Sequence, residues 1–242
     1  MQRLASYVFF IVCCGLVLSQ TKTEQQCLRE KVITFPELTT SSWVKLHPNE
    51  SMDMPAVTVC LRFYADQLTA NPCLFSLATP SHPQDFSLSW SADLKQYQMS
   101  IHNTPVQFKG LTFNLNQWNS VCATWDANSG LAQMFVNEVA SIRRVVDPKV
   151  AFNDAPVITL GQHQTRYDGG FQLTNVFTGF ISDVHVHKQA LSPRQIKTYM
   201  VQKTKYKLGD YINWHNLKYT IAGSAQVEEK QQVTFYTKEE QI

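Results

Sequence analysis

Residues 56–64 read Ala-Val-Thr-Val-Cys-Leu-Arg-Phe-Tyr, and apolar and polar side chains alternate along them. Val57, Val59, Leu61 and Phe63 fall on one face, and the intervening residues fall on the other. Alternation with a period of two is typical of a β-strand that has one buried face. We therefore predict a strand here, in a sheet whose apolar face must be covered by a second sheet.

The same pattern recurs along most of the chain. Strand-like runs cover residues 85–91, 96–102, 111–115, 121–125, 131–136, 157–160, 178–187 and 211–221. Many short strands separated by polar breaks are typical of a sandwich of two antiparallel sheets. The exception is 191–200, where Ser192 is a candidate N-cap before Pro193 and the apolar side chains follow a helical period. The sequence thus predicts an all-β sandwich that carries one short helix.

The composition is that of a folded globular domain. The 242 residues include 21 Lys and Arg against 19 Asp and Glu, and 12% of the residues are aromatic. The formal net charge of +2 gives no electrostatic footprint for nucleic acid. No P-loop, G-x-S-x-G, G-x-G-x-x-G or H-E-x-x-H motif occurs, and no strand carries a pair of carboxylates that face one way. We expect a binding protein, neither an enzyme nor a reader of nucleic-acid sequence.

The N-terminus predicts secretion. Residues 1–19 have the plan of a signal peptide, in which Arg3 precedes an apolar run over residues 7–18 and the small residue Ser19 closes it. A run of 12 residues is too short to span a bilayer, which takes about 20. No later segment is long and apolar enough to do so, and the alternative is that residues 1–19 remain as an uncleaved anchor.

The mature chain then divides into three parts. We predict an N-terminal extension over residues 20–30, one domain over residues 31–225, and a polar, mobile tail over residues 226–242 that contains a candidate late strand at 233–237. The sequon that begins at Asn49 is a candidate glycosylation site in a secreted chain.

Four cysteines remain after cleavage, namely Cys27, Cys60, Cys73 and Cys122. In an oxidising compartment they allow three full pairings, and the sequence alone does not choose between them. Cys60 and Cys122 both lie on the polar register of predicted strands, which is unusual for a free core thiol. A disulfide between the two strands is the simpler explanation, and closing a loop of about sixty residues contributes about 4 kcal/mol. The alternative is two unpaired thiols.

Residues 119–127 read Asn-Ser-Val-Cys-Ala-Thr-Trp-Asp-Ala and resemble the pentraxin signature His-x-Cys-x-Ser/Thr-Trp-x-Ser/Thr. Ser120 replaces the His, and Ala127 replaces the closing Ser/Thr. Further blocks that resemble the short pentraxins follow in family order, at residues 58–64, 160–162, 179, 191–193 and 212–219. The resemblance covers roughly residues 31–223. It implies a flattened jelly roll of two antiparallel sheets, similar to lectin and laminin-G domains, a Cys60–Cys122 disulfide, and a cyclic, usually pentameric, homo-oligomer.

The resemblance also implies two calcium ions on one face, which bind phosphate-bearing or carbohydrate ligands. The family's ligand positions fall on Pro83 and Gln84 with Asp85 beside them, on His163, Gln164 and Thr165, and on Gln172 and Asn175. Only Gln164 is unchanged, and at least three carboxylates are replaced by neutral or imidazole groups. Because Ca²⁺ needs carboxylates to neutralise its charge, we expect calcium binding to be absent or much weakened. The alternative is that Asp85, Asp168 and backbone carbonyls rebuild one site.

Two other ligand sites can be judged from the sequence. In the family's phosphocholine pocket, the apolar wall residue falls on Ser89 and the acidic partner falls near Pro105, so no group is left to hold a quaternary ammonium. Asp183, His185 and His187 alternate along a predicted strand, and two imidazoles and a carboxylate on one face are a candidate zinc site. The alternative is a solvated polar face of the strand.

The sequence as a whole predicts a secreted, pentraxin-like recognition protein of innate immunity. A cyclic homo-oligomer presents several copies of a weak site at once, which raises its affinity for an extracellular surface component. The rival interpretation is a structural matrix or coat protein in which Cys27 and Cys73 link subunits covalently. A covalent oligomer on a non-reducing gel favours the structural protein, whereas a monomer band favours a second internal disulfide.

Overall fold

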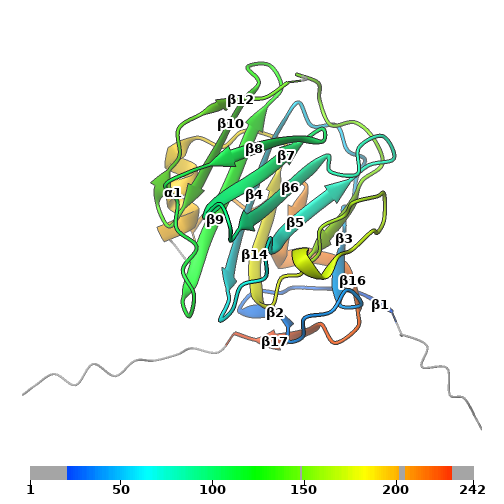
Figure 1. Ribbon diagram of the computed structural model, residues 1–242. Coiled ribbons are helices and arrows are strands. Elements are labelled where there is room, and N and C mark those ends of the chain that lie inside the picture. The colour runs from blue at the N-terminus through cyan, green and yellow to red at the C-terminus, as the bar shows by residue number, and fades with distance from the viewer. Residues whose placement is uncertain (1–20, 148, 202–204, 231–242) are drawn as a thin grey trace, which may run out of the picture.

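Two antiparallel β-sheets lie face to face, and one α-helix packs on the outside of one of them (Figure 1). The computed structural model describes residues 21–147, 149–201 and 205–230. Every strand pair in these residues is antiparallel. The prediction of a flattened all-β jelly roll with one short helix is therefore confirmed. Within the described residues, no helix has the length and apolar character needed to cross a bilayer.

Each sheet draws its strands from distant parts of the chain. Sheet A contains, in spatial order, β1 (Lys22–Gln26), β16 (Leu217–Ala222), β3 (Trp43–His47), β13 (Val157–Leu160), β5 (Cys73–Ala78), β6 (Phe86–Ser91), β7 (Gln96–Ile101) and β8 (Thr104–Phe108). Sheet B contains β11 (Val139–Ala140), β10 (Leu131–Val136), β9 (Trp118–Asp126), β4 (Ala56–Tyr64), β14 (Gly179–His187), β2 (Lys31–Phe35) and β17 (Gln226–Glu229). Two short strands extend sheet B, because β12 (Arg144–Val145) pairs with β10 and β15 (Ile212–Asn213) pairs with β14.

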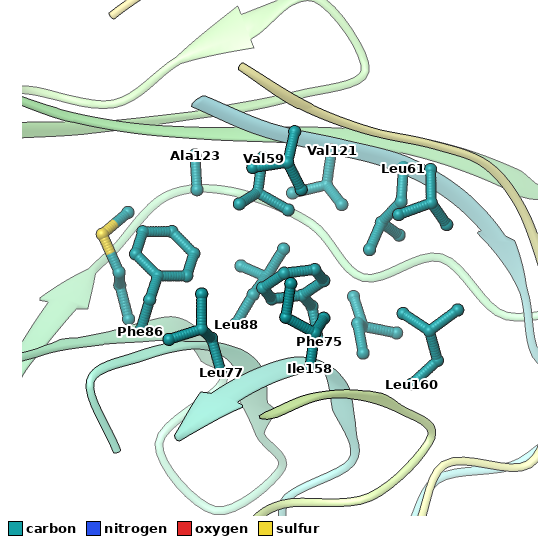
Figure 2. Close-up of a cluster of buried hydrophobic side chains, with 14 of the residues drawn as sticks. Val59, Leu61, Phe75, Leu77, Phe86, Leu88, Val121, Ala123, Ile158 and Leu160 are labelled. Atoms are coloured by element: carbon teal, nitrogen blue, oxygen red, sulfur yellow. The ribbon is translucent and has the colours of Figure 1, made fainter. Parts of the chain in front are cut away.

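The core lies between the two sheets. Figure 2 shows side chains of β4 and β9 pointing toward side chains of β5, β6 and β13. The labelled residues are all at most 1% exposed: Val59, Leu61, Phe75, Leu77, Phe86, Leu88, Val121, Ala123, Ile158 and Leu160. The apolar register predicted for residues 56–64 is the one that faces this core. Each large side chain buried here contributes about 1.5–3 kcal/mol to folding.

The two ends of the described chain add edge strands. β1 lies within the expected N-terminal extension and pairs along its whole length with β16. Residues 226–229, expected to begin a mobile tail, instead form β17 against β2. Edge strands are held by backbone hydrogen bonds on one side, so they need no regular apolar pattern. The predicted signal peptide at 1–19 and the candidate late strand at 233–237 lie outside the described residues.

Two predicted strands differ from the structure. Residues 111–115 form a loop, in which Phe113 packs 4.6 Å from the ring centre of Phe63 while Leu115 is 38% exposed. Leu111 and Phe113 pack against the core from this loop, and their spacing therefore resembles the alternation of a strand. Residues 211–221 are broken by the 3₁₀ helix η2 (Trp214–Asn216), because Trp214 turns fully into the core.

The helix α1 (Pro193–Val201) covers a disulfide on the outer face of sheet B. Cys60 and Cys122 face each other on β4 and β9 and are bonded, with 4.1 Å between their Cα atoms. The predicted pairing is therefore confirmed. Both cysteines are fully buried although they occupy the polar register, because Ile196 and Tyr199 of α1 pack against them. The polar register thus faces a second, smaller apolar cluster.

Arg62 fastens the end of α1 to sheet B. Its Nη2 donates to the carbonyl oxygen of Tyr199 at 2.5 Å, and its Nη1 donates to that of Met200 at 3.4 Å. These are carbonyls of the last helical turn, which have no partner within the helix. The Nε atom lies 3.3 Å from Oδ2 of Asp183, and both side chains are less than 20% exposed. Arg62 therefore joins the strand β4, the helix and β14 through one buried guanidinium.

Candidate functional site

The loop after β13 is anchored by Gly161 and Gln162, which belong to the family-like block at residues 160–162. Gly161 has a φ of +78°, and a Cβ atom at this position would collide with the ring of Phe35. The amide nitrogen of Gln162, which is fully buried, donates to the carbonyl oxygens of Thr39 at 2.8 Å and Ser42 at 2.7 Å. These two residues fix where the candidate calcium loop begins.

The candidate ligand residues of that loop differ in how deeply they are buried. Gln164 is fully buried and its amide nitrogen donates to the carbonyl oxygens of Ser76 at 3.2 Å and Val157 at 2.9 Å. Its Oε1 has no hydrogen-bond partner among the described residues. His163 and Asn175 are half-buried, and Gln172 is exposed just before the 3₁₀ helix η1 (Leu173–Asn175). One buried amide oxygen is therefore available in this loop, without a carboxylate beside it in sequence.

Asp85, the acidic residue nearest the family's first ligand pair, is turned into the protein. It is 2% exposed, and its Oδ2 accepts a hydrogen bond from Oγ1 of Thr79 at 3.0 Å. Its Oδ1 lies 2.5 Å from Nδ1 of His102. The neighbouring Gln84 is half-buried and uses its backbone nitrogen to hold the side chain of Asn103 at 2.9 Å. The carboxylate of Asp85 is thus already paired with an imidazole.

Asp168 is also paired, with Oδ1 lying 2.5 Å from the ammonium of Lys45. Both acids that could rebuild a calcium site therefore have a nitrogen partner of their own. Calcium takes six to eight oxygen ligands and depends on carboxylates for most of the charge. The donor set on this face, amides and imidazoles with two committed carboxylates, does not fit that ion.

A different group of ligand-type side chains does come together. His82, Asp85 and His102 place one nitrogen or oxygen atom each within 4.8 Å of one another, and no other group of three or more His, Cys, Asp or Glu does so among the described residues. Burial lowers the pKa of His102, but the hydrogen bonds to Asp85 and to the carbonyl oxygen of Val150 outweigh it and leave the pKa raised. Neither His82 nor His102 was singled out from the sequence. The signal that could have found His102 is the pair of predicted strands at 85–91 and 96–102, which form a hairpin and bring residues 85 and 102 together.

A shallow hollow of about 580 Å³ lies on the outer face of sheet A. Its lining includes Trp43, Lys45 and His47 from β3, Thr220 from β16 and Asp168 from the candidate calcium loop. The Lys45 ammonium lies 4.4 Å from the centre of the Trp43 ring, and Nε2 of His47 lies 2.7 Å from Oγ1 of Thr220. An indole, a charged pair and hydroxyl groups beside a shallow surface can contact both the apolar and the polar faces of a sugar ring.

The candidate zinc residues of β14 do not come together. A β-bulge falls between Ser182 and His185, and Asp183 within it has a φ of +53°. The bulge leaves Asp183 to pair with Arg62 and Lys230, each at 3.3 Å. His185 and His187 are fully buried, and burial lowers the pKa of His187 to about 4. The zinc prediction for these three residues was wrong, and so was its alternative of a solvated face.

Comparisons with known proteins give matches that cover most of the chain. The family model described as the Pentaxin family matches residues 31–229. Jeltraxin of Lepidobatrachus laevis is 33% identical over 194 residues, which cover 79% of this chain and 84% of that protein. Serum amyloid P-component of Mus musculus is 29% identical over 199 residues, which cover 82% and 87% respectively. The native heptameric SAP-like pentraxin of Limulus polyphemus, a solved structure, superposes with a TM-score of 0.75 at 19% identity, over 84% of this chain and 96% of that one.

Proposed function

Because the chain belongs to the pentaxin family, we propose that it is a secreted recognition protein of innate immunity that binds its ligand as a cyclic homo-oligomer. The resemblance of residues 119–127 to the family signature is confirmed by the match over residues 31–229. Support for a ring comes from the Limulus relative, which is described as heptameric. A ring places identical sites on one face, so that weak contacts add up on a repetitive surface. Asn49 lies exposed between β3 and β4, which suits a glycan.

We further propose that this recognition does not depend on the family's calcium ions. The support is that Asp85 and Asp168 are each held by a nitrogen group, at 2.5 Å in both cases. A calcium ion would have to compete with His102 for Oδ1 of Asp85 and with Lys45 for Oδ1 of Asp168. The phosphocholine route lacks support as well, since Ser89 and Pro105 offer neither an aromatic nor an acidic group to a choline cation.

The ligand class that fits best is a carbohydrate of an extracellular or microbial surface. The observation that carries this proposal is the hollow on β3, where the Trp43 ring lies beside the Lys45–Asp168 pair. Aromatic rings with a few polar groups are the usual lining of small-molecule sites. Binding rather than catalysis is the activity that such a shallow hollow supports.

Changing Trp43 to Ala should lower the apparent affinity for an immobilised glycan array at least about 100-fold, because the loss at each site is multiplied across the ring. The measurement is binding of the purified secreted protein to the array in the presence of a calcium chelator. Lys197→Ala, an exposed change on α1 on the far side of the sandwich, is the matched control and should bind as the wild type does. Size-exclusion chromatography confirms that each variant keeps its oligomeric state. Glycan binding that appears only with calcium, or that survives Trp43→Ala, contradicts the proposal.

The rival interpretation as a covalent matrix or coat protein has less support. Cys27 and Cys73 are both free, which removes the second internal disulfide. Cys73 is fully buried, and burial raises the pKa of its thiol to about 12. Only Cys27 is exposed among the free cysteines of the described chain, and one accessible thiol links at most two subunits. Thiol cross-links through these residues therefore cannot extend into a network.

A further inference from the structure

The group formed by His82, Asp85 and His102 lies at one end of sheet A and is not used by the proposed function. His82 lies in the β5–β6 loop, Asp85 immediately precedes β6, and His102 begins the turn between β7 and β8. His102 and Asn103 have φ values of 47° and 63°, which are typical of a two-residue type I′ hairpin turn. Nδ1 of His82 lies 3.7 Å from Oδ1 of Asp85, and Nδ1 of His102 lies 2.5 Å from the same oxygen.

The hydrogen bonds around His102 fix which ring nitrogen faces Asp85. Nε2 of His102 lies 2.8 Å from the carbonyl oxygen of Val150, which only accepts, so Nε2 carries a proton. Nδ1 faces the carboxylate of Asp85, which when ionised also only accepts. If the ring were neutral with its proton on Nε2, the lone pair of Nδ1 would point at the ionised carboxylate, and the two would repel each other. The 2.5 Å between the two atoms therefore suits a shared proton, whose place a metal ion can take if the two atoms separate.

We propose that His82, Asp85 and His102 bind a divalent transition-metal ion of the zinc class. Two imidazoles and one carboxylate match the three-ligand zinc sites that leave a fourth position to water. Nitrogen ligands favour zinc over calcium, and a single carboxylate suits zinc but not calcium. The side chain of His82 is 37% exposed, which gives the ion and the water a route from solvent.

Neighbouring residues hold Asp85 and His102 in place by hydrogen bonds, as they do for the ligands of known metal sites. Asp85 Oδ2 accepts from Thr79, which fixes the carboxylate and leaves Oδ1 for the ion. The bond from His102 to Val150 fixes the ring and its tautomer, as outer partners of zinc-binding histidines do. The side chains of Asp85 and His102 are 3% and 4% exposed, so water competes little for either ligand.

One distance between ligand atoms must lengthen before the three side chains can bind zinc. Zinc bonds of about 2.1 Å in a tetrahedron place neighbouring ligand atoms about 3.4 Å apart. The separation of 3.7 Å between His82 and Asp85 already fits this value. The separation of 2.5 Å between His102 and Asp85, which suits a proton, must open by about 1 Å. His82 belongs to a loop and not to a strand, so it can follow the ion as the pair opens.

The test is calorimetric titration of the chelator-stripped, full-length mature protein with ZnCl₂. The expected result is one Zn²⁺ per subunit at micromolar affinity or tighter, and the same site filled by Co²⁺ should give the visible absorption of a tetrahedral ion. His82→Ala should weaken zinc binding at least about 10-fold while leaving the fold unchanged, because His82 is half-exposed. Asp85→Asn keeps the size of the side chain and its contact with Thr79, and should also weaken binding.

The matched control is His163→Ala, which removes a half-buried histidine from another loop. It should bind zinc as the wild type does. Absence of zinc binding below millimolar concentration overturns the proposal. So does His82→Ala with wild-type affinity, or an equal loss in His163→Ala, because either result would place the ion elsewhere on the protein.

Discussion

Replacing both Cys60 and Cys122 by alanine is expected to lower the free energy of unfolding by about 4 kcal/mol. The two residues are 62 positions apart in the chain, and their bond closes this loop in the unfolded state. It joins neighbouring strands β4 and β9 in the middle of sheet B, under α1. Equilibrium unfolding in urea measures the difference, with the slope checked so that the two proteins can be compared.

The matched control for that change is Cys27→Ser, which alters an exposed and unpaired cysteine. Its free energy of unfolding should stay within about 0.5 kcal/mol of the wild type. A loss of less than about 1 kcal/mol in the double variant would contradict the prediction, because it would mean that closing this loop restricts the unfolded chain very little.

Arg62→Ala is expected to lower the free energy of unfolding by about 3 kcal/mol, the low end of the range for breaking a buried ion pair, because the two side chains are still 13% and 17% exposed. The change leaves Asp183 with Lys230 as its cationic partner, and it leaves the carbonyl oxygens of Tyr199 and Met200 without the donors that end α1. It also removes the bond from Nη1 to Oγ of Ser120, at 2.6 Å. Urea unfolding measures the loss, and amide hydrogen exchange in α1 should rise.

Two further variants make this prediction specific. Arg194→Ala removes an exposed arginine from the same helix and should cost less than about 0.5 kcal/mol. Arg62→Met keeps the aliphatic stem but not the charge, so it separates packing from hydrogen bonding. An Arg62→Ala protein as stable as Arg194→Ala would show that the guanidinium does not hold the helix in place.

The strands that the sequence predicted well are those with one face in the core. Residues 56–64 were predicted as a strand, and β4 has these bounds because its inward positions are Val, Val, Leu and Phe. β1 and β17 were not predicted, because an edge strand is held by backbone hydrogen bonds and needs no regular side-chain pattern. β2, β3, β5 and β8 were not predicted either. The buried cysteines show a related limit, since only the packing of α1 makes the polar register of β4 an interior face.

The candidate site could be predicted only in part. The resemblance named Asp85 as a candidate, and the hairpin of β6 and β7 brings it beside His102, which was not singled out from the sequence. What the sequence could not supply is the direction of each side chain, such as the inward turn of Asp85 or the salt bridge between Lys45 and Asp168. The bulge at Asp183 inserts a residue that alternation does not anticipate, and it separates the three predicted zinc ligands.

The chain has the pentraxin fold, and we propose that it also forms the family's ring but does not bind the family's calcium ions. Native mass spectrometry of the mature protein, sprayed from zinc-free buffer with calcium and again after chelation, tests it most directly. We predict a ring of identical subunits whose stoichiometry and mass do not change on chelation. A ring that carries two calcium ions per subunit and loses them on chelation, or a monomer in both conditions, would contradict the account.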